Sequence, residues 1–151
     1  MAAAMVMGAN TREPYTLILE YMLTPFSSKR LEGRWGITDV RDTVVAIQQL
    51  STEPYSLVDP QRSAITGGSA GGYTVLKTLC SYPDAFAAGT SSFGISDFFK
   101  LAEFTHKFES QYLFKLVGGT PEQVPEVYKE RSPVFLAENI KAPLLVCSFR
   151  K

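Results

Sequence analysis

A serine flanked by glycines is the feature of this sequence best suited to covalent chemistry. Residues 67–71 read Gly-Gly-Ser-Ala-Gly and match the pattern G-x-S-x-G, between a short strand pattern and a helical pattern. A serine at such a sharp turn presents its hydroxyl as a nucleophile, and Gly67, Ala70 and Gly71 leave room for the strained backbone. The spacing therefore predicts Ser69 as a nucleophile that forms an acyl intermediate.

The helix expected after Ser69 would stabilise the charge that this reaction creates. The first amides of a helix have no partner within it and lie at the positive end of its dipole. We therefore expect the backbone N–H of Ala70 to donate to the oxyanion of a tetrahedral intermediate. A glycine-rich turn that only packs a helix close to a strand is the alternative. A phosphate-binding loop is disfavoured, since no Lys-Ser/Thr pair follows and no G-x-G-x-x-G register is found.

A serine hydroxyl is a weak nucleophile unless a base, itself oriented by a carboxylate, takes its proton. The chain has one histidine, His106, and Ser69, Asp97 and His106 follow one another in the order Ser…Asp…His. We favour a different interpretation, in which His106 is a structural or surface residue. Asp97 is then a first-turn residue that a helix dipole stabilises.

The elements that must position Ser69 alternate between strands and helices. The patterns predict strands over 62–66, 86–93 and 143–149, the last a continuous apolar run typical of a strand buried on both faces. Helices are predicted from residue 38, over 70–82, from a cap at Ser96 through 104, over 106–117 and up to 131, with Thr38 capping the first. Residues 15–23 are either a strand or a short buried helix. This alternation predicts an α/β fold, with a mainly parallel sheet and flanking helices.

Aromatic residues are dense in the region after the predicted strand over 86–93. We expect them to pack helices against the sheet, although they would also suit the wall of a substrate pocket. The residues are Phe98, Phe99, Phe104, Phe108, Tyr112 and Phe114.

Composition narrows the function classes. The 151 residues amount to about one domain, and 15 basic residues balance 15 acidic ones, which favours neither nucleic acid nor a membrane as partner. No apolar run approaches the roughly 20 residues that span a bilayer. Cys80 and Cys147 suit neither a disulfide scaffold nor a metal site, and residues 1–10 have no basic start typical of a secretory signal. We expect a cytoplasmic protein without metal or cofactor.

Further motifs accompany the serine turn along the chain. In order, they are Trp35-Gly36 with Asp39 and Asp42, then residues 59–62, 64–73, 83–89, 94–97 and 105–109, Ser132-Pro133, and residues 143–145. Together they resemble the catalytic domain of prolyl oligopeptidase-family serine peptidases, in the acylaminoacyl-peptidase and dipeptidyl-peptidase branch. The resemblance covers residues 31–146. It implies a partial α/β-hydrolase fold, a peptide or ester substrate, and Ser69 as the nucleophile.

The resemblance also implies that the catalytic machinery is incomplete. In the family, the catalytic Asp and His follow the strand that corresponds to residues 143–149, so both would lie beyond Lys151. We therefore expect residues 31–151 to be a truncated catalytic domain, weak or inactive alone, and leave residues 1–30 unassigned, with no second oxyanion donor identified. A catalytically inactive remnant, or an interaction module, is the alternative. Unless residues 15–23 dock beside the strand that leads to Ser69, that strand offers an open edge for self-association or a partner chain.

Overall fold

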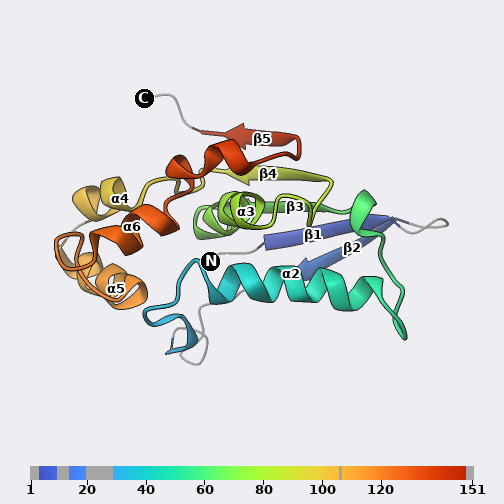
Figure 1. Cartoon of the computed structure of the whole chain (residues 1–151), viewed down its shortest axis with the longest axis horizontal. Coiled ribbons are helices and arrows are strands. Elements are labelled where there is room, and N and C mark those ends of the chain that lie inside the picture. Colours follow the sequence, from blue (N-terminus) through green and yellow to red (C-terminus); the bar gives the residue numbers. More distant parts are fainter. Residues whose placement is uncertain (1–3, 10–13, 20–28, 106, 149–151) are drawn as a thin grey trace.

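The structure is a computed structural model that describes residues 4–9, 14–19, 29–105 and 107–148. Its centre is a five-stranded sheet in the order β2-β1-β3-β4-β5 (Figure 1). The strands are β1 (Ala4–Ala9), β2 (Pro14–Leu19), β3 (Ala64–Gly68), β4 (Ala88–Ser92) and β5 (Leu144–Cys147). Strands β3, β4 and β5 are parallel to one another, whereas β1 runs antiparallel to both β2 and β3. The expected α/β class with flanking helices is confirmed, and β3, β4 and β5 form the parallel part of the sheet.

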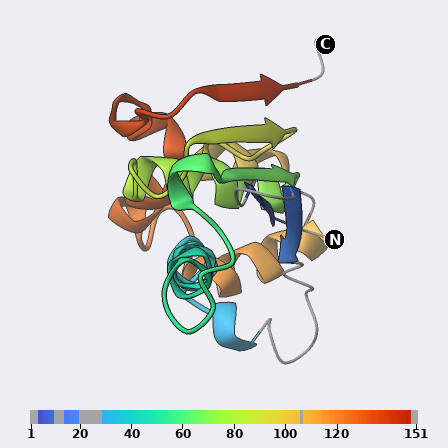
Figure 2. The same ribbon diagram turned by 90° about the vertical axis from the view of Figure 1, so that its right-hand side faces the viewer.

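The helices begin and end close to where the patterns place them. They are α2 (Thr38–Ser51), α3 (Ala70–Ser81), α4 (Phe98–Phe104), α5 (Lys107–Val117) and α6 (Pro125–Arg131), with 3₁₀ turns η1 (Pro60–Arg62), η2 (Pro133–Phe135) and η3 (Ala137–Asn139). Helices α2 and α3 lie on one side of the sheet (Figure 2). Strands β4 and β5 point toward the end of the molecule where α4, α5 and α6 gather (Figure 1).

Two of the expected helix caps are wrong. Asp97, not Ser96, caps α4, and its carboxylate accepts from the N–H groups of Phe99 at 2.8 Å and Lys100 at 3.2 Å. Thr38 is already the first helical residue of α2, and no side chain of the N-cap residue bonds to that helix end. Both Ser and Asp are good caps, so adjacent candidates differ only in how the preceding loop approaches the helix.

The strand that leads to Ser69 has a neighbour on each side, so the open edge expected unless residues 15–23 dock there is not found, although the segment beside it is a different one. Residues 15–19 form part of β2, and β2 pairs with β1 instead of β3. It is β1 that pairs with β3, with Val6 opposite Ile65. Residues 4–9 read Ala-Met-Val-Met-Gly-Ala, which contains one β-branched residue and gives little strand signal.

Strand β5 is the second departure from expectation. It is the last strand in the sheet order, and its apolar side chains are largely exposed, 60% for Leu145 and 54% for Val146. The expectation of a strand buried on both faces is therefore wrong for this chain. An apolar run indicates that a segment is suited to burial. Whether the segment is buried depends on which other elements cover it.

Helix α3 joins the two parts of the core. On one side, Val75 and Leu79 pack in a cluster with Ile47 of α2 and Ile65 of β3. On the other side, Tyr73 belongs to a cluster of aromatic and aliphatic side chains from the loop before α2 and from helices α4, α5 and α6. The helix that starts beside Ser69 is thus held by buried contacts on both sides. Among the described residues, no helix has the length and apolar character needed to cross a bilayer.

Candidate active site at the end of the third strand

Ser69 occupies the turn between β3 and α3. Its backbone has φ 54° and ψ −118°, a conformation that non-glycine residues rarely adopt, and its side chain is exposed. Its N–H donates to the carbonyl of Ser92 at 2.9 Å, and its own carbonyl accepts from the N–H of Tyr73 at 3.0 Å. Such a backbone costs about 1–3 kcal/mol and persists only where the surroundings enforce it. Here the end of β4 and the first turn of α3 do so.

The three parallel strands bring their carboxyl ends to the same edge. Gly68, Ser92 and Cys147 are in register across β3, β4 and β5. Ser69 and Phe93 therefore follow directly at the ends of neighbouring strands. In open α/β sheets, ligands bind in crevices outside this edge.

Close packing of backbone holds the first turn of α3 in place. A Cβ atom added to Gly72 would lie 2.7 Å from the Cα of Gly94 and 3.0 Å from the Oγ of Ser91. The Ser91 hydroxyl also donates to the carbonyl of Gly72 at 3.1 Å. Sequence reasoning singled out Gly67 and Gly71 and missed this contact. Gly67 lies within β3 and Gly71 lies buried in the first turn of α3, and their role in the turn stays a prediction.

A buried carboxylate links α2 to the same helix. Asp39 accepts from the N–H of Gly36 at 2.7 Å and from the hydroxyl of Thr74 at 2.9 Å. Burial raises the pKa of Asp39, and these two hydrogen bonds partly oppose the shift. The carboxylate therefore couples the loop before α2 to the second turn after Ser69. The motif Trp35-Gly36 with Asp39 is the signal that could have located this link.

Arg131 also holds the loop before α2. Its guanidinium is buried and donates to the carbonyls of Gly33 at 2.9 Å, Trp35 at 3.2 Å and Val117 at 3.2 Å. The Arg131 carbonyl accepts from the hydroxyl of Tyr73 at 3.0 Å. Burial lowers the pKa of Arg131, yet an arginine stays charged at neutral pH. Helix α6 is thus tied to α3 as well as to the loop.

The predicted aromatic group divides into buried and exposed members. Phe98 is fully buried, with ring centroids 4.8 Å from Trp35 and 4.7 Å from Tyr73. Phe99 packs on Tyr128 at 5.4 Å. These members serve helix packing, as expected. Phe104 is 77% exposed and Tyr112 is also exposed, whereas the side chain of Phe108 lies outside the described part of the chain.

The structure places some of the other predicted site residues and does not describe others. Ala70 is the first residue of α3, where a helix presents amides with no partner inside it. Asp97 is the N-cap of α4, as described above, so it lies just before the first turn in which it was expected. His106 lies outside the described residues, so its relation to Ser69 stays a prediction. No group of three His, Cys, Asp or Glu side chains in the described part of the chain is arranged to hold a metal ion.

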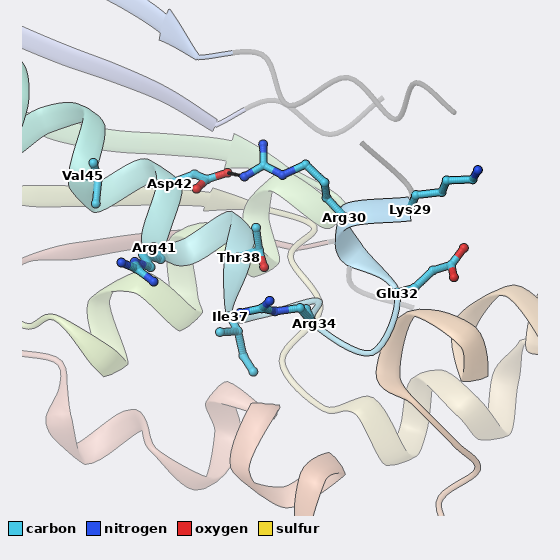
Figure 3. Close-up of a pocket in the computed structure, with 9 residues that line it drawn as sticks. All are labelled: Lys29, Arg30, Glu32, Arg34, Ile37, Thr38, Arg41, Asp42 and Val45. Atoms are coloured by element: carbon cyan, nitrogen blue, oxygen red, sulfur yellow. Dashed lines mark hydrogen bonds and ion pairs between the residues drawn. The ribbon is translucent and has the colours of Figure 1, made fainter. Parts of the chain in front are cut away.

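A separate hollow lies beside the start of α2. Figure 3 shows Arg30 reaching toward Asp42, with which it forms an ion pair at 3.2 Å. The lining side chains carry both signs of charge and are Lys29, Arg30, Glu32, Arg34, Ile37, Thr38, Arg41, Asp42 and Val45. None of the residues predicted to act with Ser69 lines this hollow.

The chain is similar in sequence to a known protein family and to individual proteins. The sequence pattern of the prolyl oligopeptidase family matches residues 28–148. Dipeptidyl aminopeptidase BIII of Pseudoxanthomonas mexicana is 31% identical over 118 residues, which are 76% of this chain and 17% of that protein.

Solved structures of peptidases also resemble this chain. A puromycin-hydrolyzing peptidase of Mycobacterium tuberculosis is 44% identical, with a TM-score of 0.73 over 80% of this chain and 18% of that one. The acylaminoacyl peptidase of Pyrococcus horikoshii is 29% identical, with a TM-score of 0.68 over 87% of this chain and 20% of that one. The chain thus spans a fifth or less of the length of these relatives.

Proposed function

Since the chain belongs to the prolyl oligopeptidase family, we propose that it provides the nucleophile of a serine-type hydrolase that acts on peptides or esters. The observation that carries this proposal is the backbone of Ser69, an exposed serine at φ 54° between β3 and α3. The match to the family spans this turn. The names of the relatives, an aminopeptidase and a peptidase that hydrolyses puromycin, favour a peptide or a small amide as substrate.

The proposed reaction proceeds through an acyl-enzyme. The Ser69 Oγ attacks the substrate carbonyl carbon, its proton passes through solvent water to the leaving group, and the carbonyl oxygen becomes an oxyanion. The N–H of Ala70 donates to this oxyanion, and loss of one such donor typically costs about 3 kcal/mol in the barrier. The tetrahedral intermediate then expels the protonated leaving group, and water hydrolyses the ester that remains on Ser69.

We propose that these 151 residues alone react slowly. The family resemblance assigns no acid and no base within them, because both follow the strand that corresponds to β5. Removal of triad members leaves an acceleration of about 10³–10⁴ over water, from the oxyanion hole and binding. Residues 31–151 are then the part of the catalytic domain that carries the nucleophile.

Two free cysteines, one of them exposed, suit a reducing compartment and support a cytoplasmic location.

A fluorophosphonate probe tests the proposal, with intact mass as the readout. We expect slow labelling to one adduct per chain, no labelling of Ser69→Ala, and unchanged labelling of Ser81→Ala, a control at the exposed far end of α3. The variant His106→Ala should label like wild type. Labelling that needs His106 would instead identify this residue as the base, and a folded chain that never labels would contradict the proposal.

A second candidate function is an interaction module that uses the edge of β5. The exposed side chains of Leu145 and Val146 favour it, because an exposed apolar edge strand is a template for pairing. The proposed occupant is an extended apolar segment of another chain, added as a sixth strand. Sedimentation should then show self-association that Leu145→Lys weakens, with Ser69→Ala having no effect. A monomer at all concentrations would exclude the self-associating form.

A further inference from the structure

Tyr73 and Thr74, about one turn into α3, are each bound to another helix through a hydroxyl group. The Tyr73 hydroxyl donates to the carbonyl of Arg131 in α6 at 3.0 Å. The Thr74 hydroxyl donates to the carboxylate of Asp39 in α2 at 2.9 Å. Both side chains are buried, and so is that of Asp39. The start of α3 is therefore held by two helices from distant parts of the chain.

The same two residues contact the turn that carries the nucleophile. The N–H of Tyr73 donates to the carbonyl of Ser69 at 3.0 Å. The Thr74 hydroxyl also lies within hydrogen-bond distance of the carbonyl of Ala70, at 3.3 Å. A hydroxyl has one proton to donate, and the carboxylate is both the nearer and the stronger of its two acceptors. Thr74 thereby joins Asp39 of α2 to Ala70 at the start of α3.

The amide of Ala70 is the group for which this link matters. Ala70 is the first residue of α3, and no residue in the described part of the chain accepts from its N–H. A donor to an oxyanion is effective when its direction is fixed before the reaction, so that no reorganisation is needed as the charge develops. Helix ends tend to fray, so an attachment one turn into the helix keeps this first amide in place.

A hydrogen bond gives the contact between α2 and α3 a direction that apolar packing would lack. Asp39 also accepts from the N–H of Gly36, so its carboxylate is held from the loop while it accepts from Thr74. Apolar groups of the same shape can replace a buried hydrogen-bonded pair with little loss of stability. Only the hydrogen bond, however, weakens steeply when its angle changes. The bond between Thr74 and Asp39 therefore resists rotation of α3 relative to α2.

We propose that Thr74 is a positioning residue, which through its hydrogen bond to Asp39 holds the N–H of Ala70 in the direction of the oxyanion. This inference rests on the proposed function, since it takes Ser69 as the nucleophile and Ala70 as a donor. Thr74 acts through the first turn of α3 and not by contact with the substrate.

The rate of fluorophosphonate labelling at Ser69 tests the inference. In this reaction the Oγ–P bond forms, the P–F bond breaks, fluoride leaves and the hydroxyl proton passes to water, while the phosphonyl oxygen takes the place of the oxyanion. Thr74→Val removes the hydroxyl and nearly keeps the shape. It should lower the maximal labelling rate about tenfold, less than the roughly 10²–10³ for loss of a donor itself, at an unchanged half-saturating probe concentration. Thr74→Ser keeps the hydroxyl and should restore most of the rate.

Thr78→Val is the matched control. Thr78 lies one turn further along α3, and its buried hydroxyl has no hydrogen-bond partner among the described residues. The same loss of a hydroxyl should leave the labelling rate unchanged at this position. All rates are compared under conditions where circular dichroism shows each variant to be fully folded, so a loss of stability alone does not alter them. A Thr74→Val variant that labels as fast as Thr78→Val would overturn the inference.

A second measurement needs no reaction. The order parameter of the Ala70 amide from NMR relaxation should be about 0.85, as in rigid backbone, and should fall in Thr74→Val but not in Thr74→Ser or Thr78→Val. An Ala70 amide that is equally rigid in all of them would also overturn the inference. Failure of the proposed function has a different signature, a wild-type chain that never labels at Ser69. A fall in the order parameter in such a chain would support the positioning role and refute the hydrolase.

Discussion

Gly72→Ala is the sharpest perturbation of the structure that holds Ser69, because it adds one methyl group where two stretches of backbone meet. The new Cβ atom would lie 2.7 Å from the Cα of Gly94 and 3.0 Å from the Oγ of Ser91. The Ser91 side chain can rotate, but the Gly94 backbone cannot move without shifting the end of β4. The added methyl must therefore push α3 and the segment after β4 apart.

Two opposing contributions determine how far Gly72→Ala changes the free energy of unfolding. Overpacking costs about 1–3 kcal/mol, and a backbone neighbour places Gly72 in the upper half of that range. Replacing glycine by alanine inside a helix gains up to about 1 kcal/mol. We therefore expect the free energy of unfolding to fall by about 1–2 kcal/mol, and Tm to fall by about 2–8 °C for a domain of this size.

Urea unfolding followed by circular dichroism measures this change. Gly68→Ala is the matched control, because its Cβ atom would meet its nearest neighbour, the carbonyl oxygen of Ser92, at 3.7 Å, an ordinary contact distance. That control should stay within about 0.5 kcal/mol of wild type. A Gly72→Ala variant as stable as wild type, or more stable, would refute the argument that close approach requires this glycine.

Three further predictions concern the buried groups around α3. Asp39→Asn should lower the free energy of unfolding by about 1–3 kcal/mol, since an amide cannot accept from both hydrogen-bond donors of the carboxylate. Burial raises the pKa of Asp39 above 3.8, so the stabilisation linked to its protonation is complete below pH 3.8 and is lost as the pH rises through the folded-state pKa. In urea unfolding, the difference in free energy between wild type and Asp39→Asn should therefore be larger at about pH 3 than at pH 7. A difference that stays constant with pH would refute this. Arg131→Lys should cost about 2–4 kcal/mol in the same assay, because an ammonium group cannot serve all three carbonyls, and a cost below about 0.5 kcal/mol would count against the role given to the guanidinium. Phe98→Ala should cost about 3–5 kcal/mol and Phe104→Ala less than about 0.5 kcal/mol by thermal unfolding, and similar costs for the two would contradict the division of the aromatic group.

The elements nearest to Ser69 were predictable because their signals are local. The glycines around Ser69 identify a turn, an apolar strand pattern precedes it, and an amphipathic pattern follows it. Alternation of such elements was sufficient to predict the α/β class. The backbone found at Ser69 agrees with the strain that the motif predicts, since its φ is positive.

The remaining features depend on contacts between distant segments. Asp39 and Thr74 lie 35 positions apart, and no periodicity reports how two helices are rotated relative to each other. The pairing of β1 with β3 joins residue 6 to residue 65, and it rests on a segment with little strand signal. The exposure of β5 depends on which elements cover that edge. Long-range register and coverage are the parts that a single sequence leaves open.

The central claim is that Ser69 carries the reactive hydroxyl of this peptidase-family chain. Peptide mapping by tandem mass spectrometry after exposure to a fluorophosphonate tests it most directly, because the measurement locates the adduct on one residue. The account predicts an adduct on Ser69 and on neither Ser91 nor Ser92, with unfolding in urea abolishing the reaction. An adduct on another serine, or equal labelling of the folded and unfolded chain, would contradict it.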